Sequence, residues 1–168
     1  MTKKELKFIQ CKKDDKEHRN ILLEMMIPYF KEIYTDCEDA SEVEVPSYEF
    51  IAKFTDDMIN MQGPHDIHFE ICYETDDMPI GFYHAKVDHH DRPGHGFIME
   101  FYILPEYRRR GYGKIMYQRI ETLFAEHGVK QMYLNSNSFT GMPFFESLGF
   151  KNADVKERIY EKTLVAER

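Results

Sequence analysis

The chain has 168 residues, and 42% of them are hydrophobic, including thirteen Phe and eleven Tyr. A chain of this length and composition can bury one hydrophobic core, so we expect a single domain over residues 1–168 and exclude wholesale disorder. The formal net charge of −8 argues against a nucleic-acid-binding protein, because nonspecific affinity depends on basic residues that displace counterions from phosphate.

The apolar segments are too short to span a membrane, since Glu24 interrupts the run over 21–27 and Glu100 the run over 97–104. The first residues, Met-Thr-Lys-Lys-Glu, differ from the apolar stretch of a secretory signal. We therefore expect a cytoplasmic protein without membrane contacts. The odd number and wide spacing of the cysteines favour reduced thiols over a disulfide framework or zinc site; they are Cys11, Cys37 and Cys72.

The N-terminal part of the chain predicts a strand followed by two helices. Weak alternation of apolar and polar residues indicates a strand at 5–11. Apolar residues at helical spacing predict a helix over 16–34, which Pro28 should kink or break. Pro46 suits the first position of a second helix, and Gly63-Pro64 should end it. The apolar face of that second helix would consist of Phe50, Ile51, Phe54, Met58 and Met61.

The middle of the chain predicts an antiparallel meander of three strands. Strict alternation of apolar and polar residues over 67–74 is typical of a half-buried strand. Two further strands are expected at 80–87 and 97–104, joined by a His-rich loop that ends at Gly94. Pro105 should stop the last of these strands.

The C-terminal part returns to helices alternating with strands. It predicts a helix over 112–128, a strand over 129–134, a short helix over 141–148 and a last strand over 158–165. The strand-helix-strand order over 97–134 requires a crossover connection, which joins parallel strands. We therefore expect an α/β (α+β) fold with a mixed, mostly antiparallel central sheet flanked by helices.

The segment 107–114, Tyr-Arg-Arg-Arg-Gly-Tyr-Gly-Lys, lies between a predicted strand and a predicted helix. A helix N-terminus offers unpaired amides and partial positive charge, glycines let the backbone approach an anion, and the arginines add charge, so the segment favours phosphate binding. A solvated basic turn fits the spacing equally well. A nucleotide-triphosphate loop fits less well, because Ile115 follows Lys114 where that motif has Ser or Thr.

Two motifs in this part of the chain resemble the GNAT superfamily of acyl-CoA N-acyltransferases. Residues 103–113, Ile-Leu-Pro-Glu-Tyr-Arg-Arg-Arg-Gly-Tyr-Gly, fit the family signature Arg/Gln-x-x-Gly-x-Gly/Ala and its preceding Pro-Glu. Residues 144–150, Phe-Phe-Glu-Ser-Leu-Gly-Phe, are similar to the family's second motif, commonly Phe-Tyr-Glu-Lys-Leu-Gly-Phe. The resemblance covers about 97–150 and implies acetyl-CoA as cosubstrate.

The resemblance also implies where CoA would bind. Amides from Arg109 to Lys114 would hold its pyrophosphate, and Arg108 and Arg110 would add charge. The strand at 101–103 would splay from the strand at 132–134 and admit pantetheine. Asn135 and Asn137 would bond to this arm, or are ordinary turn residues. The expected CoA-binding residues are Phe101, Tyr102, Ile103, Arg108, Arg109, Arg110, Gly111, Tyr112, Gly113, Lys114, Asn135, Asn137 and Phe145.

Two residues are candidates for acyl transfer. Glu100 lies within an apolar run in the strand expected to face both substrates, where burial would raise its pKa toward that of a useful base. Alternatively, Glu100 faces solvent or pairs with a Lys or Arg. The backbone amide near Ile103 would polarise the thioester carbonyl as an oxyanion donor.

Phe145 departs from the family pattern, because this position usually carries a Tyr assigned to protonate the leaving thiolate. Either another group acts or none is needed, since a thiol pKa of about 8.5 makes CoA thiolate a tolerable leaving group. Tyr102, Tyr112 and Tyr133 lie nearby in sequence, but such residues are more often packed aromatics than acids.

The acceptor is expected to be a primary amine of a small molecule or peptide. An acidic loop would attract a cationic amine, or is simply a solvated loop; its acids are Asp36, Glu38, Asp39, Glu42 and Glu44. The histidines of the hairpin region are typical of a solvated turn, so no metal is predicted; they are His84, His89, His90 and His95. The alternative function is a noncatalytic acyl-CoA-binding or sensing module. Paired subunits are common in the family, so a homodimer is one expected state.

Overall fold

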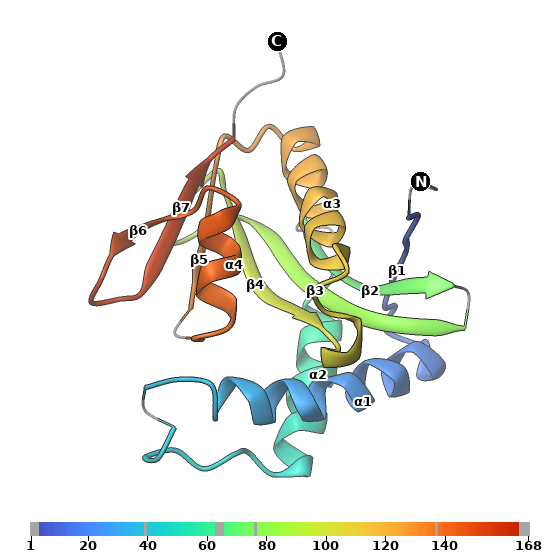
Figure 1. Ribbon diagram of the computed structural model, residues 1–168. Helices are drawn as coiled ribbons and strands as arrows, with labels where there is room; N and C mark the ends of the chain where they lie inside the picture. The colour runs from blue at the N-terminus through green and yellow to red at the C-terminus, as the bar shows by residue number, and fades with distance from the viewer. Residues whose placement is uncertain (1–3, 39, 63–65, 76, 137, 165–168) are drawn as a thin grey trace.

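A mixed sheet forms the centre of the computed structural model, which describes residues 4–38, 40–62, 66–75, 77–136 and 138–164. Within these residues seven strands follow the order β1-β2-β3-β4-β5-β7-β6 (Figure 1). They are β1 (Lys7–Gln10), β2 (Ile67–Thr75), β3 (Met78–Asp88), β4 (His95–Ile103), β5 (Gln131–Asn135), β6 (Lys151–Asp154) and β7 (Ile159–Thr163). Only the β4–β5 pair is parallel, so the predicted mixed, mostly antiparallel sheet is confirmed.

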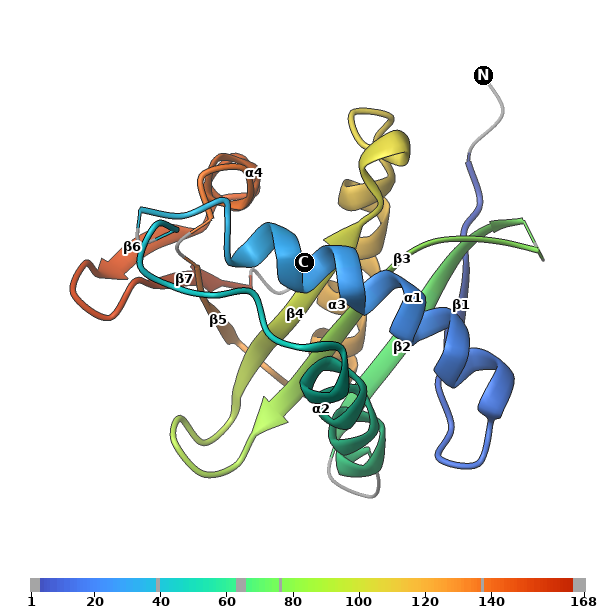
Figure 2. The ribbon, with the colours of Figure 1, turned by 90° about the horizontal axis from the view of Figure 1, so that it is seen from below.

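Helices cover both faces of this sheet (Figures 1 and 2). They are α1 (Lys16–Ile33), α2 (Tyr48–Met61), α3 (Tyr112–Glu126) and α4 (Gly141–Ser147), with a short 3₁₀ helix η1 (Pro105–Tyr107). One core lies on the side of α1 and α2 and includes Leu22, Met26, Ile51 and Phe82. The other lies on the side of α3 and α4 and includes Met116, Ile120, Phe124 and Phe145.

Helix α1 continues through Pro28, where the sequence predicts a kink or a break. The helix is uninterrupted over Lys16–Ile33. Proline removes the amide that would bond to the carbonyl four residues earlier, and that residue, Glu24, is exposed to solvent. Water can satisfy the freed carbonyl, while buried Met25 and Tyr29 hold the helix against the sheet on either side. The predicted break is therefore wrong, and the alternative of a kink at Pro28 stays a prediction.

Helix α2 begins at Tyr48, two residues after the start predicted at Pro46. The Ser47 side chain accepts a hydrogen bond from the Phe50 amide at 3.2 Å, which makes Ser47 the N-cap. Proline therefore precedes the cap and does not occupy the first turn. The predicted end at Gly63-Pro64 lies outside the described residues.

The predicted apolar face of α2 is only partly buried. Ile51 and Met58 lie in the core, whereas Phe50 is 51% exposed and Met61 is 46% exposed. Helical spacing identifies which residues share a stripe, but the width of the stripe that the sheet covers depends on tertiary packing.

Strand β6 was not predicted from the sequence. Its four residues, Lys-Asn-Ala-Asp, are all exposed, so no alternation of apolar and polar residues marks it. It is one of the two edge strands of the sheet and pairs with β7. Backbone pairing at an edge leaves little signal in side-chain hydrophobicity.

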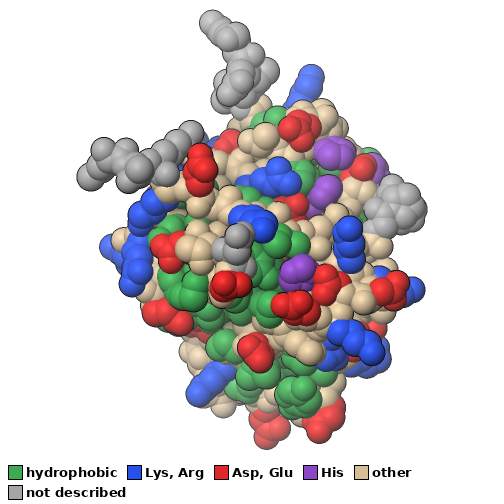
Figure 3. Space-filling view, turned by 90° about the vertical axis from the view of Figure 1, so that its right-hand side faces the viewer, with side chains coloured by type: hydrophobic (Ala, Val, Ile, Leu, Met, Phe, Trp, Pro, Cys, Tyr) green, Lys and Arg blue, Asp and Glu red, His purple; other side chains and the backbone are tan. Residues whose placement is uncertain are grey.

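The surface seen from the right-hand side of Figure 1 carries acidic and basic side chains interspersed around hydrophobic patches (Figure 3). This face has no continuous basic surface among the described residues. None of the helices in the described ranges combines the length and apolar character needed to cross a bilayer.

Candidate active site between strands β4 and β5

Strands β4 and β5 pair only at their beginnings, through Gly96 with Met132 and Phe97 with Tyr133. Beyond these pairs the strands diverge, and no further pairs join them among the described residues. Residues 101–103 of β4 are therefore unpaired with β5 as predicted, but Met132 and Tyr133, which were also expected in the splayed part, are paired. A cavity of about 800 Å³ lies at the divergence. Its lining comes from α1, β4, the start of α3, the end of β5 and the segment through α4.

A bulge in β4 distributes its side chains around this cavity. His84 of β3 pairs with Glu100 and the next residue, Ala85, pairs with Ile98, so Met99 is the extra residue. After the bulge, Tyr102 belongs to the core of α1 and α2, whereas Ile103 belongs to the core of α3 and α4. Residues on both sides of β4 line the cavity. The cavity therefore has an α1 side and an α3 side.

Glu100 lies on the α1 side and is half-buried. Burial raises the pKa of its carboxyl group from 4.5 to about 7, although a hydrogen bond from the Tyr29 hydroxyl acts in the opposite direction. No Lys or Arg of the described chain forms an ion pair with it. The alternative of an ion-paired Glu100 is therefore wrong, whereas the half-buried side chain lines a cavity and its role as a base stays a prediction.

The backbone of Ile103 faces the opening between the two strands. The amide of the next residue, Leu104, donates to the Ile80 carbonyl in β3 at 2.8 Å. Successive amides of extended backbone point to opposite sides, so the Ile103 amide points away from β3. The Ile103 carbonyl accepts a hydrogen bond from Arg108 Nε at 2.7 Å. The Ile103 amide therefore points toward the opening between β4 and β5, and its role as an oxyanion donor stays a prediction.

The N-terminus of α3 lies at the other end of the cavity. Gly111 is its N-cap with φ of 86°, and no side chain caps the helix. Its first amides have no partner within the helix and carry partial positive charge. A Cβ atom on Gly113 would lie 3.3 Å from the Phe144 ring, so glycine keeps this wall of the cavity open. Gly111, Gly113 and Lys114 line the cavity.

The three arginines before α3 have different surroundings. Arg108 donates to the Glu32 carboxylate from Nη1 at 2.8 Å and from Nη2 at 2.7 Å. A phosphate-binding role for Arg108 stays a prediction and would require this pairing to change. Arg109 is exposed, lines the cavity and has a positive φ of 63°. Arg110 is also exposed, and its guanidinium lies 5.6 Å from the centre of the Tyr107 ring.

The segment after β5 forms the remaining wall. Asn135 lines the cavity, but its Nδ2 donates to the Glu157 carbonyl at 3.3 Å, as in an ordinary turn. Asn137 lies outside the described residues. Ser138 donates to Asp36 Oδ2 at 2.7 Å, and the Thr140 amide donates to the same oxygen at 3.0 Å. The loop after α1 therefore holds the loop before α4 in place.

The sequence model of the Acetyltransferase (GNAT) family matches residues 24–150. The chain belongs to this family. The matched range contains the β4–β5 opening, the N-terminus of α3 and all of α4. A search of curated protein sequences gives no match.

Solved structures of GNAT acetyltransferases share the fold of this chain. The PaiA N-acetyltransferase from Thermoplasma acidophilum, in complex with coenzyme A, is 21% identical with a TM-score of 0.69, and the alignment covers 95% of this chain and 99% of that one. The ribosomal-protein-S18-alanine N-acetyltransferase from Escherichia coli is 13% identical with a TM-score of 0.60, covering 98% and 97%. An aminoglycoside 6'-acetyltransferase type Ii is 14% identical with a TM-score of 0.68, covering 96% and 99%.

The GNAT motif position occupied by Phe145 lies in the wall of the cavity. The ring is buried and packs against Phe101, with 5.4 Å between ring centres, and against Phe150 at 5.5 Å. Phe101 also contacts Phe144 at 5.5 Å. This wall is apolar and has no hydroxyl at the position where the GNAT motif usually has one.

Of the three tyrosines near the GNAT motifs in sequence, only Tyr102 lines the cavity. The Tyr112 hydroxyl donates to Glu74, and the Tyr133 hydroxyl donates to Asp88 at 2.5 Å. Burial raises the pKa of Tyr102, so its phenol stays protonated at neutral pH.

The acidic loop contributes little to the GNAT cavity. Asp36 is held by Ser138 and Thr140; partial burial would raise its pKa, but these hydrogen bonds outweigh burial and lower it. Glu38 is 4.0 Å from Arg158. Neither residue lines the cavity, and Asp39 lies outside the described residues. The remaining two acids of the loop, Glu42 and Glu44, are exposed and do not line it either.

The cavity-lining residues of α1 were not predicted as site residues from the sequence. Tyr29, Glu32 and Ile33 all line the cavity. Their spacing of three and four positions places them on one helix face, which is a detectable pattern. The same pattern is typical of an ordinary core stripe, so it did not distinguish these residues from core positions.

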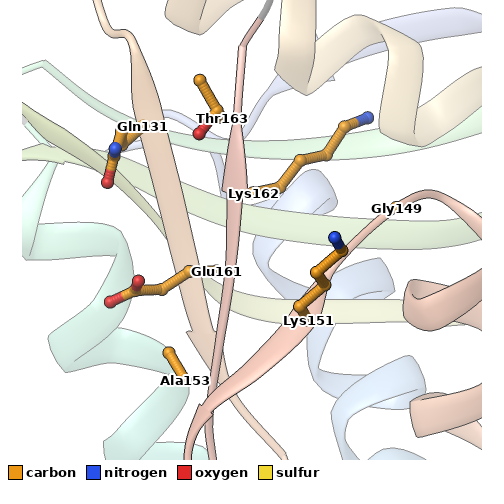
Figure 4. Close-up of a pocket in the computed structure, with 7 residues that line it drawn as sticks. All are labelled: Gln131, Gly149, Lys151, Ala153, Glu161, Lys162 and Thr163. Atoms are coloured by element: carbon orange, nitrogen blue, oxygen red, sulfur yellow. The ribbon is translucent and has the colours of Figure 1, made fainter.

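A second cavity of about 410 Å³ lies on β5, β7 and β6, away from the residues described above (Figure 4). In this view Gln131 and Glu161 extend to one side of β7 and Lys162 to the other. Lys162 Nζ donates to the Tyr117 hydroxyl at 2.9 Å and lies 3.4 Å from Glu121. Within the described ranges, no group of three or more His, Cys, Asp or Glu residues is arranged to hold a metal ion.

Proposed function

We propose that this GNAT protein transfers the acetyl group of acetyl-CoA to a primary amine of a small molecule or peptide by direct attack of the amine. One observation carries the proposal. The half-buried carboxyl group of Glu100 and the uncapped N-terminus of α3 line the same cavity. A titratable carboxylate and a helix end suited to an anion therefore face one cavity.

The described residues fit CoA on the α3 side. The free amides at the start of α3 suit a pyrophosphate, and Gly113 allows the ligand to approach the backbone. The unpaired edge of β4 offers backbone groups to the amides of pantetheine. When bound, acetyl-CoA supplies the acetyl group as an activated thioester.

Glu100 is the proposed base on the α1 side. A primary amine with a pKa of about 10.4 is protonated near neutral pH and must lose a proton before or during attack. A carboxylate with a pKa of about 7 can accept that proton near neutral pH and still be largely ionised above it. The Tyr29 hydroxyl bonds to this carboxylate and fixes its position.

The Ile103 amide is the proposed oxyanion donor, because a fixed donor directed at developing negative charge lowers the barrier. We further propose that the thiolate leaves without protonation by a side chain at position 145. Its pKa of about 8.5 makes it an adequate leaving group. If an acid contributes, Tyr102 is the tyrosine that lines the cavity.

The acceptor amine is expected to arrive in its protonated, cationic form. Two acids line the α1 side: Glu32, whose charge is paired with Arg108, and Glu100, which has no cationic partner among the described residues. The similar structures include enzymes named for a ribosomal-protein alanine and for aminoglycosides. The names of these two enzymes support an amine acceptor in general. The enzymes themselves share only their fold with this chain.

The first test is release of free thiol from acetyl-CoA with a panel of amines that includes spermidine, an aminoglycoside, lysine and short peptides. Amine-dependent release, together with a mass gain of one acetyl group on one acceptor, is the expected result. A no-amine reaction controls for hydrolysis. CoA binding without turnover on any acceptor would contradict the proposal and favour a noncatalytic CoA-binding module, the reading that Phe145 supports.

A further inference from the structure

His84 is a buried histidine on β3 that has no hydrogen-bond partner within the part of the chain that the structure describes. Its side chain is 0% exposed, and both ring nitrogens lack a partner among the described residues. An unpaired polar group in a protein interior reduces the free energy of unfolding. A group of this kind in a folded protein usually has a functional or structural role.

His84 lies directly opposite Glu100 in the antiparallel pairing of β3 and β4. Opposed residues in such a pair point to the same face, with Cβ atoms roughly 5 Å apart. On its other side, the His84 ring packs against Phe69 of β2, with 4.8 Å between ring centres. The imidazole therefore lies between an aromatic ring and the proposed base.

The carboxylate of Glu100 has room for another donor. The Tyr29 hydroxyl bonds to Oε2, and no described residue donates to Oε1. The bulge at Met99 occurs immediately before Glu100 and sets the direction of this side chain. Glu100 Oε1 therefore has no donor among the described residues. The neighbouring His84 ring has no partner there either.

We propose that His84 is a positioning residue for Glu100, whose ionised carboxylate accepts a hydrogen bond from the imidazole N–H. The bond forms through one water molecule or after a small side-chain rotation, because no direct bond joins the two groups in this structure. The amine proton moves to a Glu100 oxygen during acyl transfer, and His84 keeps its own proton throughout. The inference rests on the proposed function of Glu100 as the base.

The charged and titratable groups around His84 are consistent with a neutral donor. Burial lowers its pKa to about 3, and the charge of Lys86 on the same strand adds to this effect. The Tyr29 hydroxyl on α1 donates to Glu100 on β4, and the buried Thr55 hydroxyl on α2 donates to the Ile51 carbonyl, so neither hydroxyl is bonded to His84. A neutral imidazole has one N–H to donate and does not compete with Glu100 for the proton of the amine.

The test compares His84→Leu, which removes the donor, with His84→Gln, which keeps an N–H donor. Loss of a bond to the charged form disfavours ionisation, so His84→Leu should move the acidic limb of kcat/KM to higher pH by about one unit. His84→Gln should restore most of the wild-type position. His84→Leu should still fold and unfold at a similar temperature, because the loss of the proposed bond to Glu100 is offset by removal of the second ring nitrogen, which has no partner among the described residues.

A second readout does not depend on turnover. The Glu100 carboxyl signal in a ¹³C NMR titration, assigned by its loss in Glu100→Gln, should titrate at higher pH in His84→Leu. A folded His84→Leu protein with an unchanged titration and an unchanged kinetic limb would overturn the proposal, as would equal shifts in the Leu and Gln variants. If no amine is acetylated by wild type but the NMR titration still shifts, the His84–Glu100 pairing stands and the proposed function fails.

Discussion

Arg108 and Glu32 form a two-bonded ion pair that joins α1 to the segment before α3. The two N–O distances are 2.8 and 2.7 Å, and the residues are 76 positions apart in sequence. Each side chain is less than one third exposed. Because Arg108 also holds the Ile103 carbonyl, this pair connects the α1 side of the cavity with the backbone of β4 and with the proposed pyrophosphate loop.

Arg108→Ala should therefore affect both stability and substrate binding. Loss of charge-assisted bonds at a largely buried site should lower the free energy of unfolding by about 1–3 kcal/mol. The KM values for acetyl-CoA and for the amine should both rise. Urea denaturation and steady-state kinetics provide the two measurements.

An exposed ion pair provides the matched control for Arg108→Ala. Lys53 and Asp57 pair at 2.5 Å but are 76% and 56% exposed. Lys53→Ala should change the free energy of unfolding by no more than about 0.5 kcal/mol. Equal effects of the two substitutions would show that the Arg108–Glu32 pair has no special structural role.

Glu100→Gln should lower kcat/KM by roughly 10²–10⁴, the range typical of general-base catalysis. The wild-type base must be ionised, so activity should rise with pH through about 7. In the variant this limb should disappear. Glu24→Gln, at an exposed position of α1, is the control, and a retained limb in Glu100→Gln would assign the base to another group.

Tyr29→Phe tests the hydrogen bond to the base while keeping the aromatic packing against Phe82 and Tyr102, whose ring centres lie 5.4 and 5.3 Å away. The hydroxyl of Tyr29 lowers the pKa of Glu100. Its removal should therefore raise that pKa and shift the acidic limb of kcat/KM to higher pH. Activity should fall at pH 6 and approach that of wild type at pH 9.

Tyr48→Phe, at a position that is 57% exposed on α2, is the matched control for Tyr29→Phe. It should leave the pH profile unchanged. A Tyr29→Phe enzyme with the wild-type profile at every pH would mean that the hydroxyl does not influence ionisation of the base.

Gly113→Ala should weaken CoA binding by about tenfold, equivalent to about 1.4 kcal/mol. The added Cβ would lie 3.3 Å from the Phe144 ring and 4.0 Å from Phe101, both of which line the cavity. Calorimetry with CoA measures the change. Adding Phe144→Leu to the Gly113→Ala variant should recover part of the CoA affinity, because the smaller side chain leaves space for the new methyl group. If no affinity is recovered, the loss comes from a change in the backbone at position 113 and not from contact with Phe144.

The sequence predicted the parts of the fold that leave a periodic or local signal. Alternation identified β2, and the glycines before α3 identified the helix end at the cavity. Strand β6 has no such signal, because its residues are all exposed. The pairing of Arg108 with Glu32 and the placing of Tyr29 against Glu100 depend on how α1 packs on the sheet. Such contacts between distant segments cannot be deduced from spacing along one chain.

The divergence of β4 and β5 leaves the sheet with an unfinished hydrogen-bond ladder in its interior. The unpaired amides and carbonyls of such a strand can form backbone hydrogen bonds with another extended segment, including a strand of a second molecule. The free protein should therefore be more prone to self-association than the same protein with CoA bound. CoA at 100 times its dissociation constant would also add about 2.7 kcal/mol to the free energy of unfolding. The concentration of CoA would then affect how long the protein stays folded and monomeric, in addition to any effect on the reaction rate.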